Sequence, residues 1–128
     1  MTPRLLSCVL LVAAIACDKG GSAGGAGSRD AVIAAWKKGG LSPSPLTPAT
    51  VTVGKDCQAG TVGAIDVLLC VYPTAAEAKA AEEAGLAWVG ETTGSAQATG
   101  TVLVAISDRR KSDPSGRTIN QLMKLAPK

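Results

Sequence analysis

The strongest constraint on the fold is the segment 65–72 (IDVLLCVY), in which apolar side chains recur at every second position. This spacing places them on one face of a β-strand. A shorter run of β-branched residues at 50–53 predicts a second strand. Gly60 and Gly63 mark a turn region between the two segments, so we expect them to pair as a hairpin.

The position of the turn decides which residues of the hairpin face each other. If the hairpin is centred between Gly63 and Ala64, then Cys57 lies opposite Cys70. A disulfide between these residues would fix the register of the two strands. Closing a loop of this size is expected to stabilise the fold by about 3 kcal/mol through the unfolded state.

The first seventeen residues have the pattern of an export signal. Arg4 supplies a positive charge, residues 5–16 are mostly apolar, and the small residues Ala14 and Ala16 precede Cys17. A basic start, a short apolar run and a small-residue cleavage site are typical of a secretory signal. A membrane-spanning helix needs about 20 apolar residues, so this run is too short to be one.

The residues Ala14-Ile15-Ala16-Cys17 resemble the lipobox of bacterial lipoproteins. The resemblance covers residues 1–17 only. It implies that the Cys17 thiol receives a diacylglycerol, that residues 1–16 are removed, and that the new amino terminus is acylated. Two or more acyl chains anchor a protein stably where one would be marginal. A similar string ending at Cys8 leaves almost no apolar run before the cut, so Cys17 is the expected lipidation site.

The resemblance also implies a location and accounts for the cysteines. We expect an exported protein, lipid-anchored to a bacterial membrane and facing the periplasm or the cell exterior. Cys8 leaves with the signal and Cys17 carries the lipid, so Cys57 and Cys70 remain in a disulfide-permissive compartment. The chain has no histidine to complete a zinc site and no C-x-x-C motif. We therefore predict a structural Cys57–Cys70 disulfide.

The rest of the chain divides into a tether and one domain. Residues 17–27 comprise the lipidated cysteine and a flexible segment rich in Gly, Ser and Ala. Residues 28–128 have the length of a single domain of about 100 residues. The chain has no Phe, so Trp36 and Trp88 are expected to be its largest packing units.

Three helices and a second pair of strands complete the predicted order. The apolar spacing predicts a helix over 28–38, and a capping box, Thr74 to Glu77, starts a second helix. Gly85 is expected either to end that helix or to weaken it. Further elements are a strand at 101–106 buried on both faces, its partner at 95–98, and a helix from Asp113-Pro114. This order predicts an α+β fold: a small single domain with a mostly antiparallel four-stranded sheet and helices packed on one face.

Charge and composition exclude several classes of function. The chain has 13 Lys and Arg against 10 Asp and Glu, a balance too even to indicate a nucleic-acid partner or an anionic surface. The basic cluster 109–111 is interpreted as a solvated turn. The absence of histidine removes imidazole catalysis and the commonest metal ligand, and the glycines match no phosphate-binding motif. We therefore expect no metal, no cofactor and no enzyme activity.

Asp66, Tyr72 and Trp88 are the candidate binding residues. Asp66 lies in an apolar strand on the same face as Cys70, either on an open part of the sheet or as a functional carboxylate. We expect a non-catalytic envelope lipoprotein that binds a protein or cell-wall partner. If the tryptophans are core residues, the binding surface must be loops such as 91–100 or 107–115. The alternative is a small periplasmic enzyme or ligand carrier that uses carboxylate and hydroxyl groups around Asp66, Tyr72 and Asp108.

Overall fold

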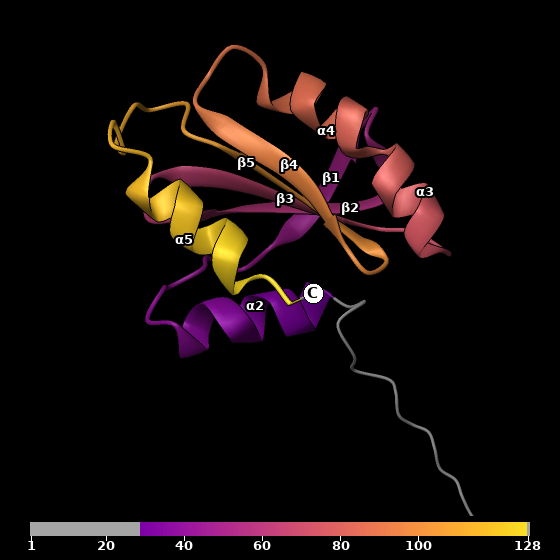
Figure 1. Cartoon of the computed structure of the whole chain (residues 1–128), viewed down its shortest axis with the longest axis horizontal. Coiled ribbons are helices and arrows are strands. Elements are labelled where there is room, and N and C mark those ends of the chain that lie inside the picture. The colour runs from indigo at the N-terminus through magenta and orange to yellow at the C-terminus, as the bar shows by residue number, and fades with distance from the viewer. Residues whose placement is uncertain (1–28, 128) are drawn as a thin grey trace, which may run out of the picture.

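The computed structural model describes residues 29–127, so the predicted signal, Cys17 and the tether lie outside the described residues. Within this range, five antiparallel strands form one sheet in the order β1-β2-β3-β5-β4 (Figure 1). The strands are β1 Thr47–Val51, β2 Gly54–Val62, β3 Ile65–Val71, β4 Gly94–Thr99 and β5 Val102–Ser107. The helices are α2 Arg29–Lys38, α3 Ala75–Ala80, α4 Glu82–Val89 and α5 Arg117–Leu125.

The predicted α+β class is confirmed, but the predicted number of strands is wrong. The sheet has five strands because the segment with Cys57, expected to be partly turn, is itself the nine-residue strand β2. It pairs with β1 on one side and with β3 on the other. Gly60 lies inside β2, where a Cβ atom would come within 2.7 Å of the Leu46 side chain. This glycine therefore allows close packing and does not mark a turn.

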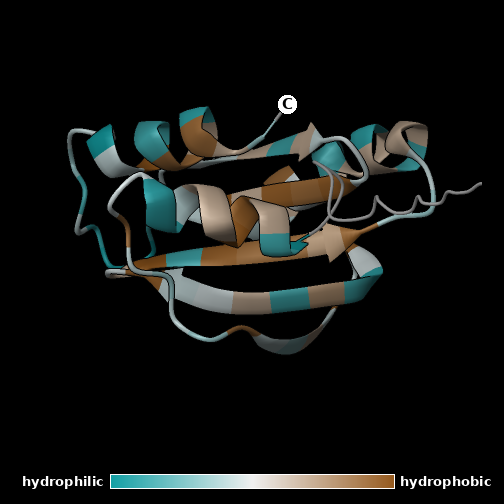
Figure 2. Cartoon of the chain, turned by 90° about the horizontal axis from the view of Figure 1, so that it is seen from below, coloured by the Kyte–Doolittle hydropathy of each residue, from teal (hydrophilic) through white to brown (hydrophobic). Residues whose placement is uncertain are grey.

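The prediction that the helices pack on one face is also wrong, because they cover both faces of the sheet (Figure 1). The central strands β3 and β5 carry apolar residues at consecutive positions, so apolar side chains lie on both faces of the sheet and both faces must be buried. One core cluster lies under α2 and α5 and includes Val67, Leu69, Val104 and Ile106. The other lies under α4 and includes Leu68, Cys70, Leu103 and Ala105. Figure 2 shows the resulting hydrophobic colour along the central strands.

The predicted register of the hairpin is confirmed, but the predicted strand 50–53 is wrong, because the partner of β3 is β2 and residues 50–53 lie at the end of β1 and in the turn after it. Val62 pairs with Ile65 across the turn, and Cys57 pairs with Cys70, to which it is joined by a disulfide. Gly63 takes a φ of 61° at the first turn position, in the left-handed region that glycine adopts freely. Counting outward from the turn, the two cysteines form a non-hydrogen-bonded pair, the type in which Cα atoms approach most closely. Their Cα atoms are 4.0 Å apart.

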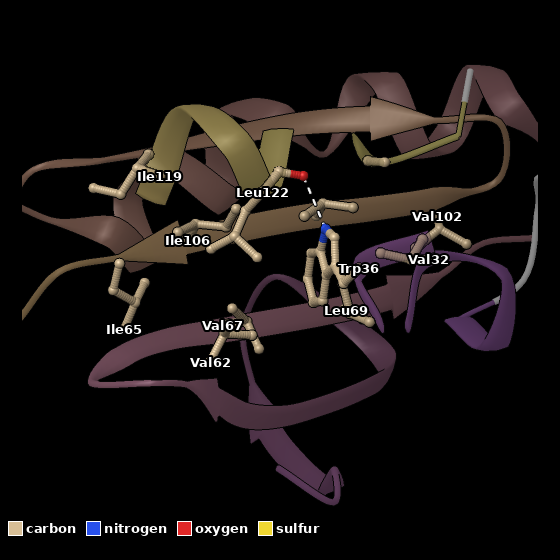
Figure 3. Packing of buried hydrophobic residues seen from close by; sticks show 12 residues of the cluster. Val32, Trp36, Val62, Ile65, Val67, Leu69, Val102, Ile106, Ile119 and Leu122 are labelled. Carbon is tan, nitrogen blue, oxygen red and sulfur yellow. Dashed lines mark hydrogen bonds between the residues drawn. The ribbon is translucent and has the colours of Figure 1, made fainter. Parts of the chain in front are cut away.

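Trp36 is the centre of the core beneath α2 and α5 (Figure 3). Its side chain is fully buried, and its Nε1 donates a hydrogen bond of 2.8 Å to the backbone oxygen of Leu122 in α5. This bond ties the C-terminal helix to α2. Trp88, by contrast, is only half-buried, so the expectation that both tryptophans are core residues holds for Trp36 alone.

The second predicted helix begins as expected but ends later. The Thr74 side chain accepts a hydrogen bond from the Glu77 backbone nitrogen at 3.1 Å, which confirms the cap. The helical region breaks at Ala81 and continues as α4 to Val89. Gly85 is buried inside α4, where a Cβ would lie 2.8 Å from the Ala96 Cβ, so it brings α4 close to the sheet.

The last helix starts later than the Asp113-Pro114 pattern predicts. α5 begins at Arg117, after Gly116 with a φ of 72°. Asp113 still acts as a cap from a distance, because its Oδ2 accepts a hydrogen bond from the Ile119 backbone nitrogen at 3.0 Å. The predicted pairing of 95–98 with 101–106 is confirmed as β4 with β5. The second strand begins one residue later than predicted, and the turn lies at Gly100 and Thr101.

Candidate functional site

Two loops meet at one end of the sheet. Residues 90–93 lead from α4 into β4, and residues 108–116 lead from β5 to α5. They are neighbours because β4 and β5 are antiparallel, and the Asp108 backbone nitrogen donates a 2.8 Å hydrogen bond to the Thr93 oxygen. Between them lies a depression of about 590 Å³, which we call the loop site. Its lining residues are Glu91, Thr92, Thr93, Asp108, Lys111 and Pro114.

Asp108 holds the second of these loops in shape. Its Oδ1 accepts hydrogen bonds from the Ser112 backbone nitrogen at 2.9 Å and the Ser112 hydroxyl at 3.0 Å, and its Oδ2 accepts one from the Asp113 nitrogen at 2.8 Å. Burial alone would raise the pKa of the Asp108 carboxyl group, but these hydrogen bonds favour the charged form and the pKa is lowered. Asp108 is therefore a structural anion of the loop.

Lys111 follows in the same loop with a φ of 55°, an uncommon backbone conformation for a residue with a side chain. Its side chain is exposed at the rim of the loop site. Within residues 29–127 we find no ion pair to Lys111, and none to Glu91 across the depression. The loop site thus presents one cation, the carboxylates of Glu91 and Asp108, and two threonine side chains.

Trp88 and Arg109 flank the loop site. The Arg109 guanidinium lies 4.4 Å from the centroid of the Trp88 ring, and its Nη2 donates to the Trp88 backbone oxygen at 2.6 Å. Its Nε donates to the Ser107 hydroxyl at 3.2 Å, and that hydroxyl is hydrogen-bonded to Thr92. A cation over an indole ring contributes about 0.5–1 kcal/mol at an exposed site. Part of the cluster 109–111, predicted to be simply solvated, therefore joins the two loops.

Asp66 forms an ion pair with Arg110 at the same end of the sheet as the loop site. Its Oδ1 lies 3.1 Å from Nη1 of Arg110, which also donates to the Ala64 backbone oxygen at 2.9 Å. The Asp66 side chain is 20% exposed and that of Arg110 is 54% exposed. A pair this accessible to water contributes little to stability. The Asp66 carboxylate therefore has a cationic partner within its own chain.

Tyr72 lies at the other end of β3, six residues from Asp66 and therefore roughly 20 Å away. Its hydroxyl donates a 2.7 Å hydrogen bond to the Val53 oxygen, and burial raises the pKa of the phenol. It contributes to a separate, mainly apolar depression of about 610 Å³. The other lining residues are Gly54, Lys55, Asp56, Val71, Pro73 and Glu77. Asp66 and Tyr72 therefore do not belong to one site.

Within residues 29–127, no cluster of three or more Cys, Asp and Glu side chains could hold a metal ion. None of the helices in this range has the length and apolar content needed to span a bilayer. The loop residues Thr92 and Lys111 were not predicted individually, because their proximity depends on the β4–β5 pairing. Comparison with protein-family models, with curated proteins and with solved structures gives no match to this chain.

Proposed function

We propose that this chain is a lipid-anchored protein of the bacterial cell envelope, whose domain binds a protein or cell-wall partner without catalysis. The N-terminal pattern that ends at Cys17 supports the anchor. The loop site supports binding, and a single observation carries it: two loops from separate parts of the chain enclose a depression of about 590 Å³. The Asp108 carboxylate holds the second loop in shape, and the hydrogen bond from the Asp108 backbone nitrogen to the Thr93 oxygen joins it to the first loop.

The loop site is suited to a polar partner. Lys111 and the Thr93 hydroxyl offer hydrogen-bond donors, and Glu91 offers acceptors, whereas the Thr92 hydroxyl already donates to the Val89 backbone oxygen. The half-buried Trp88 adds an aromatic ring of the kind found at the centre of many binding surfaces. Such a surface matches the amides and carboxylates of a peptide, or the hydroxyl groups of a cell-wall sugar.

The position of the loop site also favours a binding role. Arg29, the first described residue, donates from its Nη1 to the Asp56 backbone oxygen and to Oδ1, both at 3.0 Å. The chain therefore enters the domain beside the start of β2, whereas the loop site lies past the end of β5, at the opposite end of the sheet (Figure 1). The seven residues of β3 separate these ends by roughly 23 Å. An anchor attached before Arg29 would leave the loop site accessible.

Site-specific crosslinking in the native envelope tests the binding role. A photo-crosslinking residue at the exposed Thr93 should capture a defined protein or a cell-wall fragment. The same residue at Thr50, exposed on β1, is the control and should not capture it. Exchanging the charges with Glu91→Lys and Lys111→Glu should abolish capture while the unfolding midpoint stays the same. Equal capture from both positions would contradict the proposal.

Metabolic labelling with radioactive palmitate tests the anchor separately. Cys17→Ala should abolish the label and leave an unprocessed precursor, whereas Cys8→Ala should be labelled as the parent chain is. The reverse pattern would place the lipid at Cys8, and no label on the parent chain would remove the anchor from the proposal.

A ligand carrier is the second candidate, and the Tyr72 depression is the observation that favours it. Apolar walls with a few polar groups at the rim are typical of small-molecule sites. An added side chain at Gly54 would come within 2.7 Å of the Tyr72 hydroxyl, so Gly54→Val should disturb the depression. A carrier should retain a small apolar molecule through purification, and this variant should lose it. If extraction of the parent chain yields no such molecule, this candidate is wrong.

A further inference from the structure

The charges of the domain are segregated between its two helix layers. Helices α2 and α5, on one face of the sheet, carry five basic residues and one acidic residue, namely Arg29, Lys37, Lys38, Arg117 and Lys124 against Asp30. Helices α3 and α4, on the other face, carry one basic and three acidic residues, namely Lys79 against Glu77, Glu82 and Glu83. The nearly even charge of the whole chain conceals this separation.

Four of the five cations on α2 and α5 point away from the core. Arg29 is engaged with Asp56, but the other four residues are exposed. No ion pair to any of them is found in the part of the chain that the structure describes. We call these four the basic layer: Lys37, Lys38, Arg117 and Lys124.

The members of the basic layer lie on one continuous surface. α2 and α5 pack on the same face of the sheet, and the Gln121 side chain donates to the Gly39 backbone oxygen at 3.3 Å, which joins the end of α2 to α5. In α5, Ile119 and Leu122 are buried. Arg117 and Lys124, two helical turns apart, lie on the opposite side of that helix.

A shallow depression of about 330 Å³ lies in the outer surface of α5. Its lining residues are Arg117, Asn120, Gln121, Lys124 and Leu125. The guanidinium, the ammonium and the two amides supply several hydrogen-bond donors for phosphate oxygens. Its volume suits a small anionic group held between two cations.

We propose that the basic layer lies on an anionic phospholipid surface, with a headgroup phosphate in the depression on α5. Each Lys or Arg near such a surface raises the affinity by roughly fivefold, so four together are sufficient for a weak but specific attachment. A lipid surface fits better than a single-stranded nucleic acid, which is held partly by stacking of its bases on aromatic side chains. The one tryptophan in α2 and α5, Trp36, is fully buried, and among the described residues no aromatic side chain is exposed on these two helices.

This contact is independent of the proposed anchor, since it uses described residues only. The two would nevertheless act together. Residues 18–28 span at most about 40 Å when fully extended, so an acylated Cys17 would keep the basic layer close to the headgroups. The attachment would then be effectively intramolecular, and weak contacts would be sufficient to orient the domain.

Vesicle co-sedimentation of the full chain, with Cys17→Ser to prevent lipidation, tests the proposal. The measured quantity is the affinity for phosphatidylcholine vesicles with about one third phosphatidylglycerol, divided by that for phosphatidylcholine alone. The N-terminal residues 1–16, which include Arg4, are the same in every variant, so their contribution cancels when the ratios of two variants are compared. We expect a ratio of roughly several hundred at low salt, falling as salt is added.

Two matched double variants locate the contact. Arg117→Gln with Lys124→Gln should lower the ratio by roughly thirtyfold. Lys55→Gln with Lys79→Gln removes the same charge elsewhere and should change the ratio by less than about twofold. Unchanged unfolding midpoints verify that both variants fold. A parent ratio near one, an equal loss in both variants, or equally tight binding to heparin in solution would overturn the proposal.

Discussion

Removal of the Cys57–Cys70 disulfide should destabilise the domain strongly. The two residues are 13 apart in sequence, and closing such a loop in the unfolded chain contributes about 3 kcal/mol. Both side chains are buried, so replacing them with alanine also removes packed sulfur atoms from the core. We expect the double variant Cys57→Ala/Cys70→Ala to lose about 3–5 kcal/mol of unfolding free energy.

The structure also indicates where order is lost first. Among the described strands, β1 pairs with β2 alone, and these two strands are joined to the rest of the sheet through β3, which lies between β2 and β5. Without the disulfide, β1 and β2 can open while β3, β5 and β4 stay paired. Amide hydrogen exchange in the double variant should therefore accelerate across residues 47–62 more than across residues 102–107.

Urea unfolding and thiol counting test this reasoning. The parent chain should unfold at higher urea than the double variant, and a reducing agent should shift the parent but not the variant. The thermal midpoint of the variant should be lower by more than about 12 °C. A loss below about 1 kcal/mol, with the parent fully oxidised, would refute the loop-closure reasoning. Free thiols at both positions in the unreduced parent would refute the bond itself.

Three further changes probe the core and the loops. Trp36→Phe removes the hydrogen bond to Leu122 and leaves space beside α5, so urea unfolding should show a loss of about 2–4 kcal/mol in unfolding free energy. An unchanged unfolding midpoint would contradict the packing in Figure 3. Gly85→Ala should cost about 1–2 kcal/mol, although alanine favours helix, because its Cβ meets Ala96; a gain in stability would count against that close contact. Because the pKa of Asp108 is lowered in the folded state, its carboxylate stabilises the fold above the unfolded pKa, near 4, and this stabilisation is lost as pH falls through the folded pKa. Asp108→Asn should therefore flatten the decline of unfolding free energy below about pH 4. Identical pH profiles for the two proteins would exclude this role.

The strand β3 and the Cys57–Cys70 register were the most predictable parts of the fold, although β2 itself was not predicted as a strand. The turn after Gly63, the alternation in β3 and the two cysteines all depend on short-range spacing, and they agree on one register. The cap at Thr74 was predictable for the same reason, because a capping box involves residues three positions apart. Patterns of this kind require no knowledge of the rest of the molecule.

The errors arose where distant segments decide the structure. Gly60 and Gly85 look like turn or end signals along the chain, yet each lies inside a regular element and allows a neighbour to approach. The consecutive apolar residues of β5 indicated burial on both faces, whereas those of β3 were interpreted as alternation with one apolar face, and neither pattern indicates which helices provide the cover. The pairing of Asp66 with Arg110 joins residues 44 positions apart, so no local pattern could predict it.

The loop site and the basic layer together constrain how the domain would be presented at a membrane. Helices α2 and α5, which carry the basic layer, cover one face of the sheet, and the loop site lies at one end of it. If α2 and α5 rest on the headgroups, the sheet lies roughly parallel to the membrane and the acidic α3–α4 layer faces away from it. The loop site then opens sideways, near the membrane surface. A partner captured at Thr93 should therefore be membrane-associated, and the double change Arg117→Gln/Lys124→Gln should reduce its capture, although neither residue lines the loop site. Unchanged capture would show that partner binding does not depend on this orientation.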